Sequence, residues 1–169
     1  VLDGTSAVML SEETAIGKFP VRVVEMMARV CRTAEKDLVF APEPLGSRTH
    51  QSVRDGIAHA ACLLARDINA SVIICVTDSG ATAKHISRYN PSNPVLACTT
   101  SVNVARELAM YPGVIPVIVD EQMSIEKLLD RAVARGKERE LVKSGDRIVF
   151  TGNLTGTIGE TNLLSSVMV

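Results

Sequence analysis

Small hydroxyl-bearing residues and a glycine gather in one short stretch, TDSGATA, at residues 77–83. The stretch follows the apolar, β-branched run SVIICV and precedes residues with a helical pattern. Hydroxyls and backbone N–H groups at the start of a helix bind anions, because the helix dipole places partial positive charge there. Gly80 would let the backbone approach a ligand closely. The stretch therefore predicts a phosphate site, with Thr77, Ser79 and Thr82 as hydroxyl donors.

The same stretch also has a purely structural interpretation. Ser79 could be the N-cap of the helix, and Thr82 could be an ordinary surface residue. The stretch has neither the G-x-x-x-x-G-K nor the G-x-G-x-x-G spacing, so it is not one of the common glycine-rich phosphate loops. Both interpretations stay open on these residues alone.

Two further segments could belong to the same site. TGNLTGTIGETN, residues 151–162, holds three glycines and four threonines, and it is long for a hairpin loop. RGKER, residues 135–139, could supply a cation. The first segment could instead be a flexible turn, and the second a solvated helix end whose positive charges complement the helix dipole. We find no nucleophile–base–acid constellation and no residues at metal-ligand spacing, so neither a catalytic nor a metal site is predicted.

The composition limits the classes of function. The 169-residue chain is 46% hydrophobic with a net charge of -1, which is typical of a folded domain. A nucleic-acid surface is not expected, because there is no basic excess and only 3% of residues are aromatic. No apolar run is long enough to cross a bilayer. The cysteines fit buried, reduced thiols and a cytoplasmic location: Cys31, Cys62, Cys75 and Cys98.

The elements that must position these residues alternate between strand and helix. This order predicts a three-layer α/β/α domain with a mostly parallel five-stranded sheet, and ligands then bind beyond the carboxyl ends of the strands. The last two strands have no helix between them, so the sheet should end in an antiparallel hairpin. The expected strands are 71–76, 95–99, 114–120, 146–152 and 163–169, and the expected helices are 52–69, 81–89, 102–110 and 124–142.

The first segment does not follow this alternation. Residues 7–11 read as one strand and residues 21–37 as one helix, followed by a linker rich in proline. One strand and one helix cannot form a core of their own. We therefore expect residues 1–46 to be the last unit of a larger domain, and residues 47–169 to be a second domain.

Four segments together resemble the pyruvate kinase family. VLDGTSAVMLSEETAIGKFP is similar to the family's D-G-x-D-x-x-M-L-S-G-E-T-A-x-G-x-Y-P, and TDSGATAKHISRYNPSNPVLACT to its T-x-S-G-x-[ST]-A motif with the following R-P-x-x-P. YPGVIPV resembles Y-x-G-V-x-P, and SGDRIVFTGNLTGTIGETN resembles G-D-x-[IV]-V-x-x-[ST]-G with its later G-x-x-G-x-T-N. The segments occur in family order and cover nearly the whole chain.

The resemblance implies a place within a longer enzyme. In this family a TIM barrel transfers phosphate from phosphoenolpyruvate to ADP in glycolysis, with Mg2+ and K+, in the cytoplasm. Residues 1–46 would be the last strand and helix of the barrel plus a linker, and residues 47–169 the C-terminal domain, which binds an allosteric effector and forms a tetramer interface. The metal ligands and catalytic residues would lie on earlier strands, so we expect no cofactor and no kinase activity in this chain.

The resemblance also assigns roles within the C-terminal domain. The segment 77–82 matches the loop that holds one phosphate of a sugar bisphosphate effector, Arg139 matches an arginine on the other phosphate, and residues 155–157 match a loop that closes over the sugar. The implied effector-binding residues are Thr77, Asp78, Ser79, Gly80, Thr82, Arg139, Thr155, Gly156 and Thr157.

Two residues depart from the family pattern. Glu12 stands where the family usually has glycine, a residue that tolerates positive φ. Asp78 adds a negative charge to the phosphate loop, and at 4 Å two like charges repel by about 4 kcal/mol at an effective dielectric of about 20. We therefore expect fructose 1,6-bisphosphate to bind weakly or not at all, and a sugar monophosphate or AMP to be preferred. The alternatives are a purely structural oligomerisation domain with a vestigial pocket and a free-standing phosphate-binding protein.

Overall fold

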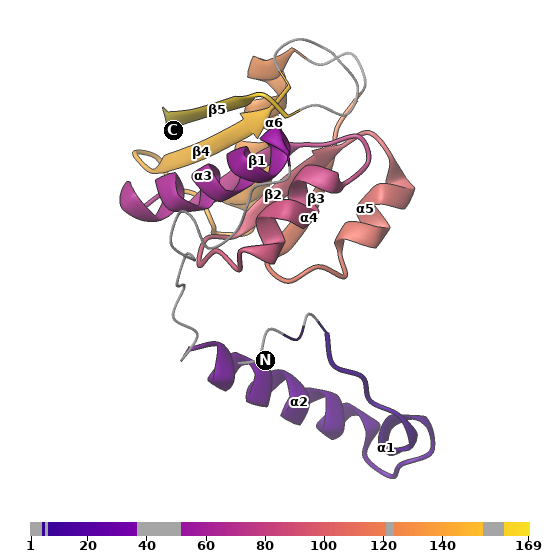
Figure 1. The fold of residues 1–169 in the computed structure, drawn as a ribbon. Helices are drawn as coiled ribbons and strands as arrows, with labels where there is room; N and C mark the ends of the chain where they lie inside the picture. Colours follow the sequence, from indigo (N-terminus) through magenta and orange to yellow (C-terminus); the bar gives the residue numbers. More distant parts are fainter. Residues whose placement is uncertain (1–4, 6, 37–51, 121–123, 154–160) are drawn as a thin grey trace. The chain divides into compact units, whose positions relative to one another are not determined.

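The chain forms two compact units, Val1–Ala41 and Pro42–Val169 (Figure 1). The structure is a computed structural model that describes residues 5, 7–36, 52–120, 124–153 and 161–169. The boundary predicted at residues 46 and 47 lies outside the described residues and stays a prediction.

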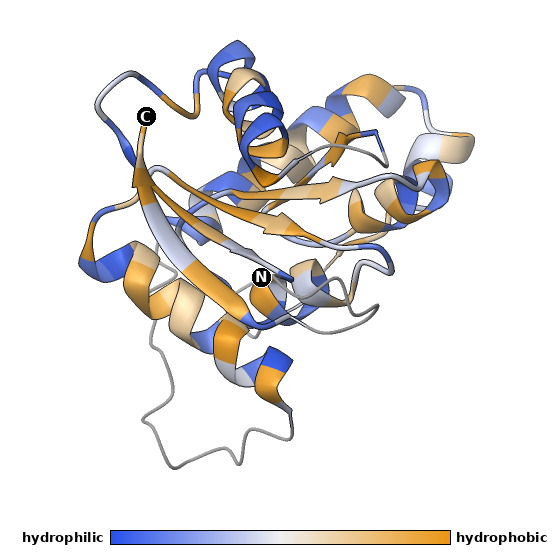
Figure 2. Cartoon of the chain, turned by 90° about the horizontal axis from the view of Figure 1, so that it is seen from above, coloured by the Kyte–Doolittle hydropathy of each residue, from blue (hydrophilic) through white to orange (hydrophobic). Residues whose placement is uncertain are grey.

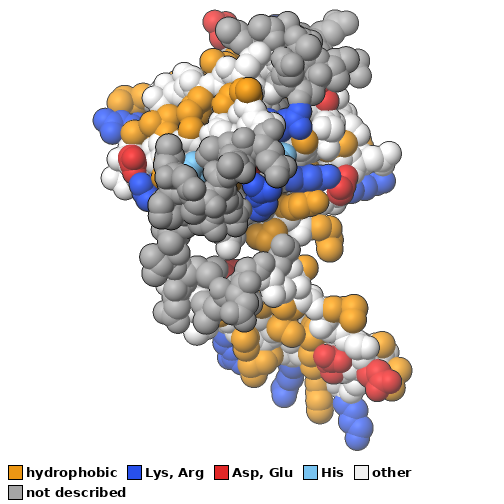
Figure 3. Space-filling view, in the orientation of Figure 1, with side chains coloured by type: hydrophobic (Ala, Val, Ile, Leu, Met, Phe, Trp, Pro, Cys, Tyr) orange, Lys and Arg blue, Asp and Glu red, His pale blue; other side chains and the backbone are white. Residues whose placement is uncertain are grey.

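The first unit contains helices α1, Glu12–Ala15, and α2, Pro20–Glu35. Proline at the first position suits a helix start, because the backbone N–H that proline lacks has no partner there. None of the residues of α2 is buried, and Figure 3 shows hydrophobic side chains at the surface of this unit beside lysine and arginine. The strand predicted at residues 7–11 is wrong, because these residues carry no strand. A strand needs a neighbour with which to pair, and the described part of this unit offers none.

The departure at Glu12 has no backbone consequence. Glu12 begins α1 and is not among the residues with positive φ in the described chain. Glutamate suits the first turn of a helix, where the helix dipole favours negative charge. The glycine that the family usually carries is therefore not needed for the backbone to follow this path.

The second unit is built on one five-stranded sheet in the order β3-β2-β1-β4-β5. The first four of these strands pair in parallel, and β5 runs antiparallel to β4, as the sequence predicted. The strands are β1 Val72–Val76, β2 Val95–Thr99, β3 Val114–Ile118, β4 Arg147–Gly152 and β5 Leu163–Met168. The run SVIICV forms a central strand because β1 is covered on both faces, which continuous apolar sequence allows.

Helices cover both faces of the sheet and complete the three layers. They are α3 Val53–Asp67, α4 Ala81–Arg88, α5 Val102–Leu108 and α6 Ile125–Glu138. Helix α6 buries Leu128 and Ala132 in one core together with Ile74 and Leu96. Alternate strand residues point to the opposite face, where α3 and α4 pack on each other and on β1. Figure 2 shows the corresponding pattern, with hydrophobic strands between helices that are hydrophobic on one side.

Helix α6 ends four residues earlier than predicted. Glu140 adopts a left-handed conformation with φ of 59°, and the Leu141 N–H donates to the Gly136 carbonyl at 2.9 Å. This is the hydrogen-bond pattern of a helix C-terminus, usually made by glycine. Because glutamate rather than glycine occupies this position, the end of the helix is not marked in the sequence.

Candidate functional site: an anion loop at the carboxyl edge of the sheet

The segment 77–82 lies where the order of the sheet reverses. Strands β2 and β3 extend the sheet on one side of β1, and β4 returns to its other side. In open parallel sheets, ligands bind beyond the carboxyl ends of the strands at such a reversal. The loop after β1 and the first residues after β4 therefore border the place where a ligand is expected.

The loop after β1 begins at a buried threonine and ends at a glycine with positive φ. The side chain of Thr77 is only 6% exposed, and its N–H donates to the Cys98 carbonyl at 2.9 Å. Gly80 has φ of 80°, a conformation that glycine adopts easily. Between them, Asp78 and Ser79 are exposed to solvent.

Helix α4 starts without a side-chain cap. Its N-cap is Gly80, so the alternative in which Ser79 caps the helix is wrong. By contrast, the N-cap serines of the other helices of this unit accept a hydrogen bond from the helix backbone: Ser52, Ser101 and Ser124. The first turn of α4 thus carries N–H groups without a capping side chain, and such groups attract anions.

Thr82 joins this loop to the hairpin segment. Its hydroxyl oxygen lies 2.7 Å from that of Thr161, and both side chains are only 4% exposed. The alternative in which Thr82 is a surface residue is therefore wrong. The base of the hairpin loop is closed by a hydrogen bond from the Asn162 N–H to the Gly152 carbonyl at 3.0 Å. Two segments about 80 residues apart in sequence thus meet at one place.

Thr151 is the first threonine of the segment 151–162, which the sequence analysis put forward for the same site without singling this residue out. It lies on β4 in register with Cys75 of β1, and it is fully buried. Its hydroxyl has no hydrogen-bond partner among the described residues. Buried hydroxyls nearly always have a partner, so Thr151 is an exception close to the carboxyl edge of the sheet. A threonine at the end of an otherwise apolar strand was the available signal.

The structure does not bring Arg139 to this loop. Arg139 is the C-cap of α6 and is exposed. A Cβ on Gly136, three residues earlier, would lie 3.3 Å from Leu96 near the start of β2. Helix α6 therefore ends toward the amino ends of the strands, whereas the anion loop follows the carboxyl end of β1. Thr155, Gly156 and Thr157 lie outside the described residues and stay a prediction.

The remaining candidates for chemistry are structural. All four cysteines are free, and burial raises the pKa of Cys62 and of Cys98 to about 12, so these two thiols stay protonated and unreactive. The described residues contain no group of three potential metal ligands among His, Cys, Asp and Glu. None of the helices in the described ranges is long and apolar enough to span a bilayer.

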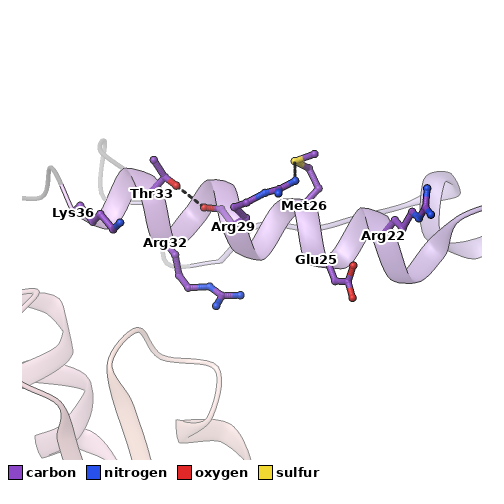
Figure 4. A pocket seen from close by; sticks show the side chains of 7 residues that line it. All are labelled: Arg22, Glu25, Met26, Arg29, Arg32, Thr33 and Lys36. Carbon is purple, nitrogen blue, oxygen red and sulfur yellow. Dashed lines mark hydrogen bonds between the residues drawn. The ribbon is translucent and has the colours of Figure 1, made fainter.

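A separate basic groove lies along α2. Its side chains all come from this helix, and Figure 4 shows them in a row: Arg22, Glu25, Met26, Arg29, Arg32, Thr33 and Lys36. The Thr33 hydroxyl donates to the Arg29 carbonyl at 2.9 Å, and the Arg29 guanidinium lies 3.2 Å from the Met26 sulfur. The groove is lined by four positively charged side chains and one glutamate, so it is a second place in the described chain where a phosphate could bind.

The chain is similar in sequence and in fold to known pyruvate kinases. The family model described as "Pyruvate kinase, alpha/beta domain" matches residues 55–166. Pyruvate kinase 2 of Synechocystis is 38% identical over the whole chain, and a pyruvate kinase of Clostridium acetobutylicum is also 38% identical. A crystal structure of a Cryptosporidium parvum pyruvate kinase superposes on 99% of the chain with a TM-score of 0.90 and 36% identity. The chain spans 28% and 36% of the length of these two curated relatives, and 34% of the solved one.

Proposed function

The chain belongs to the pyruvate kinase family, and on this premise we propose that it is the C-terminal regulatory part of a longer enzyme. That enzyme would transfer phosphate from phosphoenolpyruvate to ADP in the cytoplasm, with Mg2+ and K+ bound by segments outside this chain. The chain spans about a third of the length of its relatives, which supports assigning the phosphate transfer to segments outside it. Within the chain, the function that we propose is the binding of a phosphorylated effector, a sugar phosphate or AMP.

The observation that carries this proposal is the contact between Thr82 and Thr161. It brings the uncapped start of α4 against the end of the hairpin loop, with both hydroxyls buried. One phosphate group could accept hydrogen bonds from the N–H groups of α4 and from whichever of these two hydroxyls does not donate to the other. Such bonds to a charged acceptor each stabilise a complex by about 1.5–3 kcal/mol.

The exposure of Asp78 weakens the argument against a bisphosphate. A carboxylate in contact with water is screened, and at physiological ionic strength its field decays over about 8 Å. The repulsion of about 4 kcal/mol expected for a partly buried charge is then an upper limit. A bisphosphate therefore stands beside the monophosphates as a candidate effector, although we expect it to bind less tightly than it would without Asp78.

Calorimetry with Thr82→Val tests the effector site. The chain is titrated with inorganic phosphate, AMP and fructose 1,6-bisphosphate. We expect Thr82→Val to weaken the binding of the ligand that binds best by about tenfold, which is about 1.4 kcal/mol or one lost hydrogen bond to a charged group. Thr33→Val is the matched control, because it removes a hydroxyl from the basic groove of α2. Binding that Thr82→Val weakens no more than Thr33→Val does would contradict an effector site at this loop.

Assembly through β5 is a second candidate function. Strand β5 ends the sheet and pairs with β4 alone among the described strands, so its outer edge offers unpaired backbone groups. Met168 is 66% exposed and Val167 is also exposed, and Figure 3 shows hydrophobic side chains at the surface where Figure 1 draws β5. An edge of this kind pairs readily with a second copy, which agrees with a homo-oligomer such as a tetramer of the full-length enzyme.

Sedimentation of Met168→Lys tests the assembly function. Lysine on an edge strand opposes pairing with another strand, since its charge would be buried in the new contact. We expect the wild-type chain to dimerise and Met168→Lys to sediment as a monomer with unchanged stability. Met9→Lys is the control, because Met9 is similarly exposed but lies in the first unit. A wild-type chain that is monomeric at all concentrations would contradict assembly through this edge.

A further inference from the structure

A buried carboxylate ties the far end of α4 to α3. Asp55 lies in the first turn of α3 and is only 5% exposed. One of its oxygens, Oδ1, accepts hydrogen bonds from the Arg88 guanidinium at 2.9 Å and the Tyr89 hydroxyl at 3.0 Å, and lies 3.2 Å from His85 Nδ1. All three partners belong to the last turn and C-cap of α4.

The aromatic rings around Asp55 stabilise the same junction. The rings of His59 on α3 and Tyr89 lie 4.9 Å apart. Burial and the hydrogen bond to Asp55 raise the pKa of Tyr89, so its hydroxyl stays a donor at neutral pH. The N–H of Asp55 donates to the Ser52 side chain that caps α3. The carboxylate is thus fixed on α3 and in turn fixes the end of α4.

Helix α4 is short, so its two ends move together. It has eight residues, which corresponds to a length of about 12 Å. Its start forms the anion loop, and its end is held by Asp55. A shift or rotation of the last turn would therefore displace the N–H groups of the first turn and the Thr82 hydroxyl, which meets Thr161 at 2.7 Å.

We infer that Asp55 is a positioning residue for the anion loop, acting on it through α4. This inference rests on the proposed effector site. Asp55 is 5% exposed, and its carboxylate is hydrogen-bonded to three side chains at the end of α4. Its negative charge therefore determines where the anion loop, at the other end of α4, places its hydrogen-bond donors. Charged hydrogen bonds are about twice as strong as neutral ones, so the neutral isostere should hold α4 less firmly.

The test is Asp55→Asn in the full chain, followed by amide NMR without ligand and by titration with inorganic phosphate. We expect the amide signals of residues 81–83 to shift and phosphate to bind at least tenfold more weakly. Val142→Ala is the control for loss of stability, because Val142 lies in the core on the α6 side of the sheet. It should leave both readouts at wild-type values.

Each outcome decides the inference. Unchanged signals of residues 81–83 in Asp55→Asn, or changes equal to those in Val142→Ala, would overturn it. A wild-type chain that binds no phosphate would contradict the effector site, while the ligand-free signals still decide whether Asp55 positions the loop. Should Asp55→Asn not fold, Tyr89→Phe removes one donor and keeps the ring against His59. It should shift the same signals, and unchanged signals would again overturn the inference.

Discussion

Gly80 sets the direction in which the chain enters α4. Its φ of 80° is costly for any residue with a Cβ, and an added Cβ would lie 3.2 Å from Leu108 and 3.3 Å from Val104. An alanine at this position would therefore need both a strained backbone and small shifts of the α5 side chains. This places Gly80 among the residues on which the shape of the anion loop depends.

Gly80→Ala should lower the free energy of unfolding by about 2–3 kcal/mol. Left-handed backbone accounts for about 1–2 kcal/mol of this loss and crowding for at least about 1 kcal/mol. Urea denaturation measures the change. Gly113→Ala is the matched control, because Gly113 also has positive φ, 70°, but a Cβ there would meet no atom within 4 Å. Equal losses at the two glycines would contradict the packing that we assign to Gly80.

Asp78→Asn should change the affinity for fructose 1,6-bisphosphate by less than about fivefold at physiological salt. The carboxylate is exposed, and exposed charge pairs contribute about 0.2–1 kcal/mol. Calorimetry at low and at physiological ionic strength measures the effect, which should be larger at low salt. A gain of a hundredfold or more at physiological salt would mean that Asp78 turns into the pocket when the ligand binds.

The residues of the loop were predictable, whereas their partners were not. Thr77, Gly80 and Thr82 follow a strand at a spacing that indicates an anion loop. Thr161 and Thr151 belong to the segment 151–162, which the sequence analysis put forward for the same site, but no local pattern predicts which of its threonines contacts Thr82. The residue type of Arg139 suits a phosphate, whereas its position at the end of α6 depends on the direction of that helix, which local sequence does not give.

Among the elements, α6 depends on a glycine for its packing. A Cβ on Gly136 would lie 2.7 Å from Val142 and 3.3 Å from Leu96, both of which belong to the core on this face. Glycine normally weakens a helix interior. Its presence in α6 is explained by the close approach of the helix to the segment that leads into β4.

Gly136→Ala should destabilise the chain by about 1–3 kcal/mol, as overpacked cores do. Gly56→Ala, the same substitution inside α3, should instead stabilise it by about 0.5–1 kcal/mol, because a Cβ there meets no atom within 4 Å. Thermal unfolding of the two variants measures both changes. Stabilisation by alanine at both positions would contradict the contact between α6 and Val142.

The elements of the second unit and helix α2 of the first followed from local sequence, whereas the strand expected at residues 7–11 did not form. Apolar runs and serine caps mark the strands and most of the helices of the sheet domain, where each strand finds its neighbour within the chain. Residues 7–11 have the composition of a strand, but the described part of their unit offers no strand with which to pair. The composition of a segment shows that it can form a strand, but the strand forms only when a neighbouring strand is present to pair with it.

For the whole molecule, we predict regulation without catalysis. The chain spans about a third of its pyruvate kinase relatives, and the resemblance places the catalytic residues on segments outside it. A coupled assay of pyruvate formation from phosphoenolpyruvate and ADP, with Mg2+ and K+, should show no turnover. A full-length relative measured in parallel is the control. Turnover by the purified chain would contradict this prediction, because it would mean that the chain has an active site of its own.

We propose that the loop 77–82 and Thr161 together hold a phosphate. Amide NMR of the full chain during titration with inorganic phosphate tests it most directly, because every backbone N–H outside proline reports separately. We predict that the largest and earliest shifts fall on residues 80–83 and on Thr161. Shifts that fall instead on α2, along the groove of Arg22, Arg29 and Arg32, would contradict it.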